Sequence, residues 1–213
     1  FFWCDIVRYG IIKIHPLALL NYADQDEETK KKIDKLTVGY SNVLDYYVEK
    51  LAFGIAKIAS AFYPNDVIVR FSDFKSNEYR NLLGGLRYEP IEENPMIGWR
   101  GASRYYSKEF SEAFSLECTA IKRVREQMGL TNVVVMIPFC RTPEELLKVY
   151  DTMKRYGLQR HVFRDEIVVQ DNKDALHFPP QVEKSVNSSQ PDKLPISGLR
   201  VFLMAEIPSN FLL

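Results

Sequence analysis

The chain has 213 residues, and its 28 lysine and arginine residues balance 28 aspartate and glutamate residues, so no overall field would draw in nucleic acid or an acidic membrane surface. The three cysteines, Cys4, Cys118 and Cys140, are far apart and odd in number. They favour reduced thiols in a cytoplasmic protein over a disulfide framework. There is no Cys-x-x-Cys pair for structural zinc and no apolar run long enough to span a membrane.

The first predicted elements are a long helix and a short strand. From Asn42 to Phe62 the apolar residues recur at steps of three and four, at Val48, Leu51, Ile55, Ile58 and Phe62. This spacing predicts an amphipathic helix. A short buried strand is predicted from Val67 to Phe71, followed by a polar loop from Ser72 to Glu93 that is long enough to be functional.

Two further buried runs and two helices follow. Met96–Trp99 is predicted as a second strand, Phe110–Met128 as a helix that Gly129 ends, and Asn132–Phe139 as a third strand. Thr142, Pro143 and Glu145 form a helix start with an N-cap, a proline at the first helical position and a capping box. The buried face of that helix is expected to comprise Leu146, Leu147, Tyr150 and Met153, with Gly157 at its end. The last strand is predicted at Leu199–Ile207.

Apolar strands that alternate with helices indicate an α/β fold with a parallel sheet covered by helices. The segment 161–197 interrupts this alternation. It is rich in Asp, Asn, Ser, Gln and Pro, and we expect an exposed insertion there. The chain begins and ends on bulky apolar residues, so both ends are expected to cut through a larger fold.

Charged residues follow the apolar runs at Arg70, Arg100, Arg141 and Glu206. Each could simply be solvated or paired with a neighbouring charge. If the runs are neighbouring parallel strands, however, three guanidiniums and one carboxylate meet at the edge where ligands of such folds gather. This arrangement suits a small anion held together with a divalent metal. Arg104 is expected to add positive potential at the same rim.

Several ordered stretches resemble the phosphoenolpyruvate synthases, also called pyruvate, water dikinases. They read VIVRFSDFKSNEY from Val67, ENPMIGWRGASRY from Glu93, MGLTN from Met128, MIPF from Met136 and EIPSN from Glu206. The resemblance covers about residues 14–158 and 199–213. It implies a (β/α)8 TIM barrel that binds phosphoenolpyruvate or pyruvate with Mg²⁺. It further implies that Arg70 and Arg100 grip the phosphoryl and carboxylate groups, and that Glu206 is the first metal ligand.

The sequence departs from this family in places. Trp3 stands where the family has an arginine, Asp5 where it has a glutamate, and Lys13 where it has a glycine. The Gly-Ser-Asn-Asp segment with the second metal ligand and the later catalytic cysteine are absent. In the family, ATP phosphorylates a histidine on a separate domain. His15 does not match that histidine and is expected to be structural.

These observations predict a single partial barrel domain over residues 1–213, with about five of the eight strands of the complete barrel. The chain is expected to be a transferase fragment that is inactive alone, because the nucleotide-binding and phosphohistidine domains lie outside it. Two alternatives remain open. One is a non-catalytic remnant that binds a partner or associates with itself through open sheet edges. The other is a barrel of the pyruvate, phosphate dikinase type.

Overall fold

The computed structural model describes residues 7–160 and 198–207, and this part of the chain contains a parallel sheet. It contains three strands in the order β1 (Val67–Arg70), β2 (Val133–Ile137) and β3 (Val201–Leu203). Val67 pairs with Val133, and Val135 pairs with Val201. Because the strands are parallel, the carboxyl ends of all three lie at the same end of the sheet, as expected for an α/β fold.

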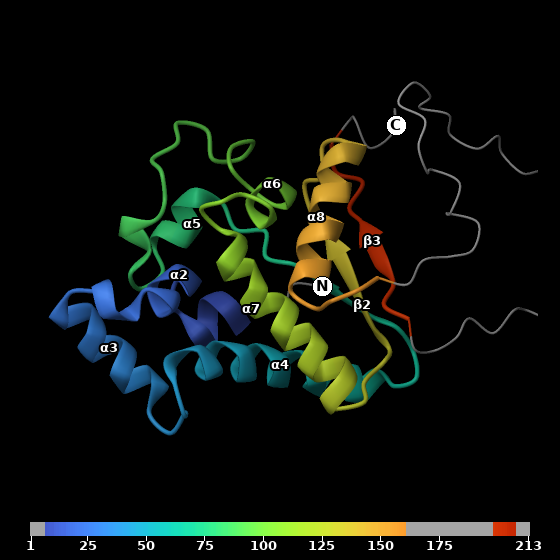
Figure 1. Cartoon of the computed structure of the whole chain (residues 1–213), viewed down its shortest axis with the longest axis horizontal. Helices are drawn as coiled ribbons and strands as arrows, with labels where there is room; N and C mark the ends of the chain where they lie inside the picture. Colours follow the sequence, from blue (N-terminus) through green and yellow to red (C-terminus); the bar gives the residue numbers. More distant parts are fainter. Residues whose placement is uncertain (1–6, 161–197, 208–213) are drawn as a thin grey trace, which may run out of the picture.

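Most of the described helices lie on one side of this sheet, and β3 lies at the outer edge of the described part (Figure 1). The described helices and helical turns are η1 (Val7–Ile12), α2 (Pro16–Leu20), η2 (Tyr22–Asp24), α3 (Glu27–Thr37), α4 (Val43–Phe62), α5 (Ser76–Arg80), η3 (Gly85–Arg87), α6 (Ala102–Tyr105), α7 (Ser111–Lys122), η4 (Arg123–Gln127) and α8 (Pro143–Arg155). The longest of them, α4, packs against α7 and β1, and α8 lies in front of β2 and β3 in this view. No helix in the described ranges is long and apolar enough to cross a membrane.

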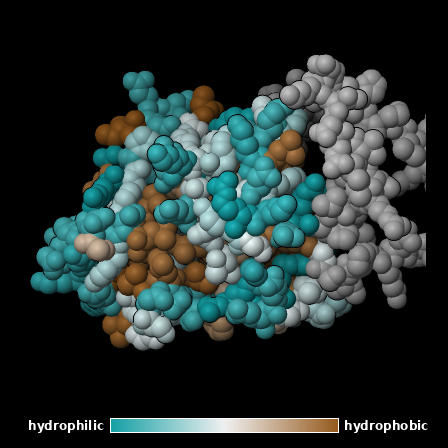
Figure 2. Space-filling view, in the orientation of Figure 1, coloured by the Kyte–Doolittle hydropathy of each residue, from teal (hydrophilic) through white to brown (hydrophobic). Residues whose placement is uncertain are grey.

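The predicted periodicity of α4 matches its burial, except in the last turn. Leu51 and Ile55 are almost fully buried in a core that also contains Val69 and Val135 from the sheet. Phe62, by contrast, is 57% exposed, because α4 extends beyond the core that its middle turns cover. Apolar surface patches remain on the face shown in Figure 2, the largest where α2, α4 and α7 come together.

The start of α8 confirms the predicted N-cap and corrects the predicted capping box. The Thr142 side chain accepts a hydrogen bond from the Glu145 backbone N–H. The Glu145 carboxylate does not return to Thr142 but accepts from the backbone N–H of Arg141, at 2.6 Å. The helix also buries Val149 and leaves Leu147 59% exposed, so the predicted buried face was wrong at Leu147.

Two predictions between β1 and α7 were wrong. Met96–Trp99 forms turns instead of a strand, with Met96 53% and Ile97 72% exposed. This apolar run is short and lies next to Pro95 and Gly98, which favour turns over a strand. The predicted loop after β1 contains a helix, α5. The predicted insertion at 161–197 and the departures at Trp3 and Asp5 lie outside the described residues.

Candidate active site at the carboxyl ends of the strands

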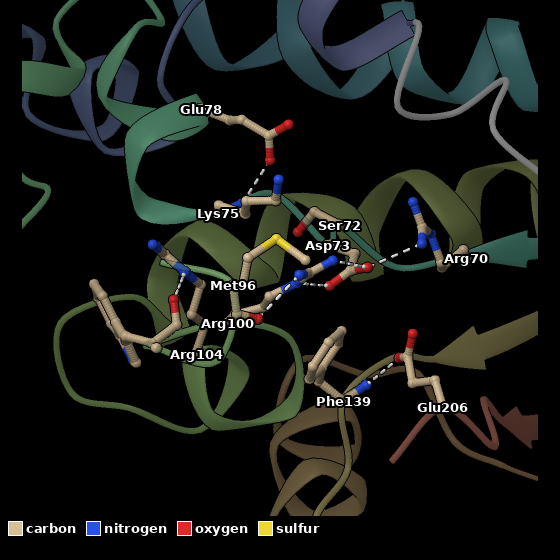
Figure 3. A network of polar contacts seen from close by, with 12 residues as sticks. Arg70, Ser72, Asp73, Lys75, Glu78, Met96, Arg100, Arg104, Phe139 and Glu206 are labelled. Atoms are coloured by element: carbon tan, nitrogen blue, oxygen red, sulfur yellow. Dashed lines mark hydrogen bonds and ion pairs between the residues drawn. The ribbon is translucent and has the colours of Figure 1, made fainter. Parts of the chain in front are cut away.

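One carboxylate joins two of the predicted site arginines. Arg70 is the last residue of β1, and its Nη1 lies 2.9 Å from Oδ2 of Asp73, three residues further on. Arg100 donates from Nε to Oδ1 of Asp73 at 2.8 Å and from Nη2 to Oδ2 at 2.9 Å. Figure 3 shows both guanidiniums turned toward this carboxylate. We call Arg70, Asp73 and Arg100 the Asp73 clamp.

The loop that carries Arg100 is fixed by hydrogen bonds to its backbone. The Trp99 N–H donates to Oε1 of Glu92 at 2.9 Å, and the Trp99 carbonyl accepts from Nε of Arg104 at 2.8 Å. Arg141 donates from Nη2 to the Gly98 carbonyl at 3.1 Å. Although this segment is not a strand, these bonds hold Arg100 at the end of the sheet.

Phe139 links Arg100 to Glu206. Its ring centroid lies 4.1 Å from Cζ of Arg100, which is a cation–π contact, and its backbone N–H donates to Oε1 of Glu206 at 2.7 Å (Figure 3). Phe139 has a φ of +47°, which bulky residues rarely adopt. Strained backbone of this kind clusters at functional sites. The Phe139 turn therefore brings the ends of β2 and β3 next to the Asp73 clamp.

The charges of these residues influence one another. Burial lowers the pKa of Arg100, but the hydrogen bonds and the charge of Asp73 outweigh this effect and raise it above its usual value. Loss of hydration raises the pKa of Glu206, and the Asp73 carboxylate adds to this. The Phe139 N–H and the charges of Arg100 and Arg70 oppose that rise. These mutual effects place Glu206 in the same electrostatic environment as the two arginines.

Arg70, Arg100 and Glu206 thus come together at one end of the sheet, as the sequence predicted. Arg141 is close by, but its guanidinium donates to the carbonyls of Gly98 and Phe139 and braces the two loops. The prediction for Arg104 was wrong. Its side chain is fully buried and pairs with Glu89 instead of adding charge at the rim.

Arg104 belongs to a buried cluster behind the Arg100 loop. Its Nη1 and Nη2 donate to the two carboxylate oxygens of Glu89 at 2.8 and 2.5 Å. Nε2 of His15 lies 2.9 Å from Glu89, and Nδ1 of His15 accepts from the Leu17 N–H at 3.2 Å. Burial lowers the pKa of His15. Because Nδ1 accepts the Leu17 N–H, Nε2 is the ring nitrogen that can donate to Glu89. His15 is fully buried and held on both ring nitrogens, as expected of a structural histidine.

Sequence reasoning missed Asp73 and Phe139. Asp73 follows β1 closely, and its position near Arg70 was a usable signal. Its pairing with Arg100, 27 residues away, was not readable from local pattern. Phe139 was predicted as the end of a strand, and a phenylalanine carries no signal for a positive φ. Both side chains depend on how separate loops meet.

The residues present allow a magnesium site with one protein carboxylate. Mg²⁺ is usually held by one or two carboxylates, with waters and substrate oxygens completing its shell. Within residues 7–160 and 198–207, no cluster of three or more histidine, cysteine, aspartate or glutamate residues could hold a metal by itself. Asp73 is occupied by guanidinium N–H groups, which leaves Glu206 as the metal-ligand candidate. A carboxylate has lone pairs for both a backbone N–H and a metal.

Cys140, next to Phe139, is expected to be unreactive in the folded chain. It is 3% exposed, and burial together with the charge of Glu145 raises its pKa to about 11. Because the thiolate is the nucleophile, alkylation by iodoacetamide at pH 8 should be at least about tenfold slower than in urea-unfolded chain. Peptide mass spectrometry would follow the residue. Equal rates in folded and unfolded chain would contradict this placement.

Residues 25–173 match the family model described as PEP-utilising enzyme, PEP-binding domain, and the chain belongs to this family. Among characterised proteins it is similar to enzymes named phosphoenolpyruvate synthase. It is 44% identical to that of Aquifex aeolicus (strain VF5), over 98% of this chain and 26% of the relative. It is 48% identical to that of Synechocystis sp. (strain ATCC 27184 / PCC 6803 / Kazusa), over 95% and 21%. It is 44% identical to that of Escherichia coli (strain K12), over 98% of this chain and 22% of the relative. The chain therefore spans about a fifth to a quarter of the length of these relatives.

Proposed function

We propose that this chain is the part of a phosphoenolpyruvate synthase that holds pyruvate or phosphoenolpyruvate together with Mg²⁺. The parent reaction would convert ATP, pyruvate and water to phosphoenolpyruvate, AMP and phosphate through a phosphohistidine, in the cytoplasm. The observation that carries the proposal is the convergence of Arg70, Arg100 and Glu206 at one end of a parallel sheet. The names and the identities of the relatives support the same reaction.

In this proposal the two arginines bind the negative oxygens of the substrate. A planar guanidinium pairs with a carboxylate or phosphoryl group through two parallel N–H bonds, which a lysine cannot do. Glu206 would hold Mg²⁺, whose charge would stabilise the enolate and phosphoryl oxygens during transfer. Arg141 would add positive charge beside the substrate while it braces the loops. The guanidiniums, held in place before the substrate arrives, would stabilise the developing charge without reorganisation.

The described sheet would be part of a (β/α)8 barrel, with residues 1–213 forming a single partial domain and 161–197 an insertion. The parent enzyme would supply the nucleotide-binding and phosphohistidine domains, so we expect no synthesis of phosphoenolpyruvate by this chain alone. No role with nucleic acid or membranes is proposed. Strand β3 leaves Phe202 39% and Leu203 40% exposed, which is compatible with pairing of two copies along this edge.

Titration calorimetry with Mg²⁺ and oxalate, a mimic of the pyruvate enolate, tests the site. The chain should release or take up heat on binding, and Arg100→Ala should weaken binding by at least about tenfold, because a bidentate charged contact is lost. Arg200→Ala is the matched control. Arg200 pairs with Asp66 at the opposite end of the sheet, so oxalate binding should be retained in this variant.

The same titration separates the main proposal from the non-catalytic alternative. No heat at millimolar oxalate, from a chain that circular dichroism shows to be folded, would reject the substrate site. It would favour a remnant that acts by association, which sedimentation would then reveal as a dimer. If Arg200→Ala abolishes oxalate binding as fully as Arg100→Ala does, the oxalate binds at another place in the chain.

A further inference from the structure

We infer that Asp73 is a positioning residue that sets the relative arrangement of Arg70 and Arg100 before an anion binds. This inference rests on the proposed function of the site. Asp73 is 4% exposed, and its carboxylate accepts N–H groups from both arginines, at 2.8 to 2.9 Å. Two guanidiniums repel each other, and the shared carboxylate offsets that repulsion and fixes their geometry.

The backbone next to Asp73 is itself held rigidly. The Ser72 N–H donates to Oε2 of Glu117 at 3.1 Å, and the Ser72 carbonyl accepts from the Tyr105 hydroxyl at 2.6 Å. Glu117 is 1% exposed and pairs with Arg8 at 2.7 Å. The Asp73 carboxylate therefore projects from a fixed point, which a residue that positions others requires.

The contacts of Arg100 show which donors are left for a ligand. A guanidinium has five N–H donors. Two of those on Arg100 bind Asp73, and a third binds the Met96 carbonyl at 3.2 Å. The remaining two have no hydrogen-bond partner among the described residues, while Phe139 covers one face of the group. The Asp73 carboxylate thus binds one edge of the Arg100 guanidinium and leaves two of its N–H groups for an anion.

This geometry predicts an effect opposite to that of simple charge. Asp73→Asn removes a negative charge beside an anion site, so electrostatics alone would strengthen oxalate binding. If Asp73 positions the arginines, the amide should weaken binding by about tenfold or more, because its NH2 group cannot accept a guanidinium N–H. Asp73→Glu keeps the charge but moves it by one methylene, and should also weaken binding.

Asp66→Asn is the matched control. It removes the same charge from an aspartate that also pairs with an arginine, Arg200, at the other end of the sheet. Oxalate binding should stay within about twofold of that of the unsubstituted chain, as expected for distant charges screened by salt. Circular dichroism of each variant would show that the fold is retained.

A second measurement needs no folded Asp73 variant. NMR spectra of the arginine Nε–H groups provide this measurement, and the Arg100 signal is the one that disappears in Arg100→Lys. In the unsubstituted chain the Arg100 Nε–H should exchange slowly with water, because it donates to Asp73. Fast exchange of this N–H with water would overturn the inference. So would an Asp73→Asn variant that binds oxalate as tightly as the unsubstituted chain. If the Arg100 N–H exchanges slowly but the chain binds no oxalate, the proposed function is rejected, while the pairing of Asp73 with the arginines is retained.

Discussion

Glu89→Gln is expected to lower the free energy of unfolding by about 3–5 kcal/mol, the range for removing one partner of a buried ion pair. The substitution changes the shape of the side chain little, but it leaves the Arg104 guanidinium fully buried without its countercharge. Burial opposes the ionisation of Glu89, yet the hydrogen bonds of Arg104 and His15 outweigh it and lower its pKa. Urea denaturation followed by circular dichroism would measure the loss.

Glu49→Gln provides the matched control for this prediction. Glu49 is 3.2 Å from Arg123, and both side chains of that pair are partly exposed, at 49% and 29%. Exposed pairs contribute about 0–1 kcal/mol, so this variant should be nearly as stable as the unsubstituted chain. Equal losses for the two variants would contradict the assignment of Glu89 as a buried structural anion.

Gly101→Ala should be similarly damaging, for a steric reason. Gly101 has a φ of +60°, and a Cβ there would lie 2.6 Å from the Pro138 carbonyl oxygen and 2.7 Å from Cβ of Phe139. Gly101 combines this φ with a ψ of −133°, which side-chain-bearing residues rarely adopt, so backbone strain of about 1–3 kcal/mol would add to about 1–3 kcal/mol of overpacking against backbone. Because the displaced turn holds Glu206 and supports Arg100, oxalate binding should fall as well. Denaturation and calorimetry would measure the two effects.

Gly129→Ala separates the two contributions to this effect. Gly129 also has a positive φ, of +72°, but nothing lies within 4 Å of a Cβ placed there. This variant should lose only the strain of about 1–2 kcal/mol and bind oxalate normally. If both glycine variants lost the same stability and retained oxalate binding, the close approach of Gly101 to the Phe139 turn would have no effect on the binding site.

Much of the secondary structure was predictable because its signals are local. The spacing of apolar residues located α4, and continuous apolar runs located β1 and β2. Thr142 with Pro143 marked the start of α8 because capping involves neighbouring residues only. The same patterns failed at Met96–Trp99, where an apolar run next to a proline and a glycine forms exposed turns.

The sequence by itself determined the parallel α/β class, the strands β1 and β2, and the placement of Arg70 and Glu206 at or beyond strand ends. It also carried the family motifs around Arg100. Only the tertiary structure decided which charges meet. Arg100 lies just before α6 and Arg104 lies within it, four residues further on. Yet Arg104 is buried against Glu89, whereas Arg100 faces the Asp73 carboxylate. Helices and strands follow from interactions between near neighbours, whereas a carboxylate shared by two arginines depends on how distant loops pack together.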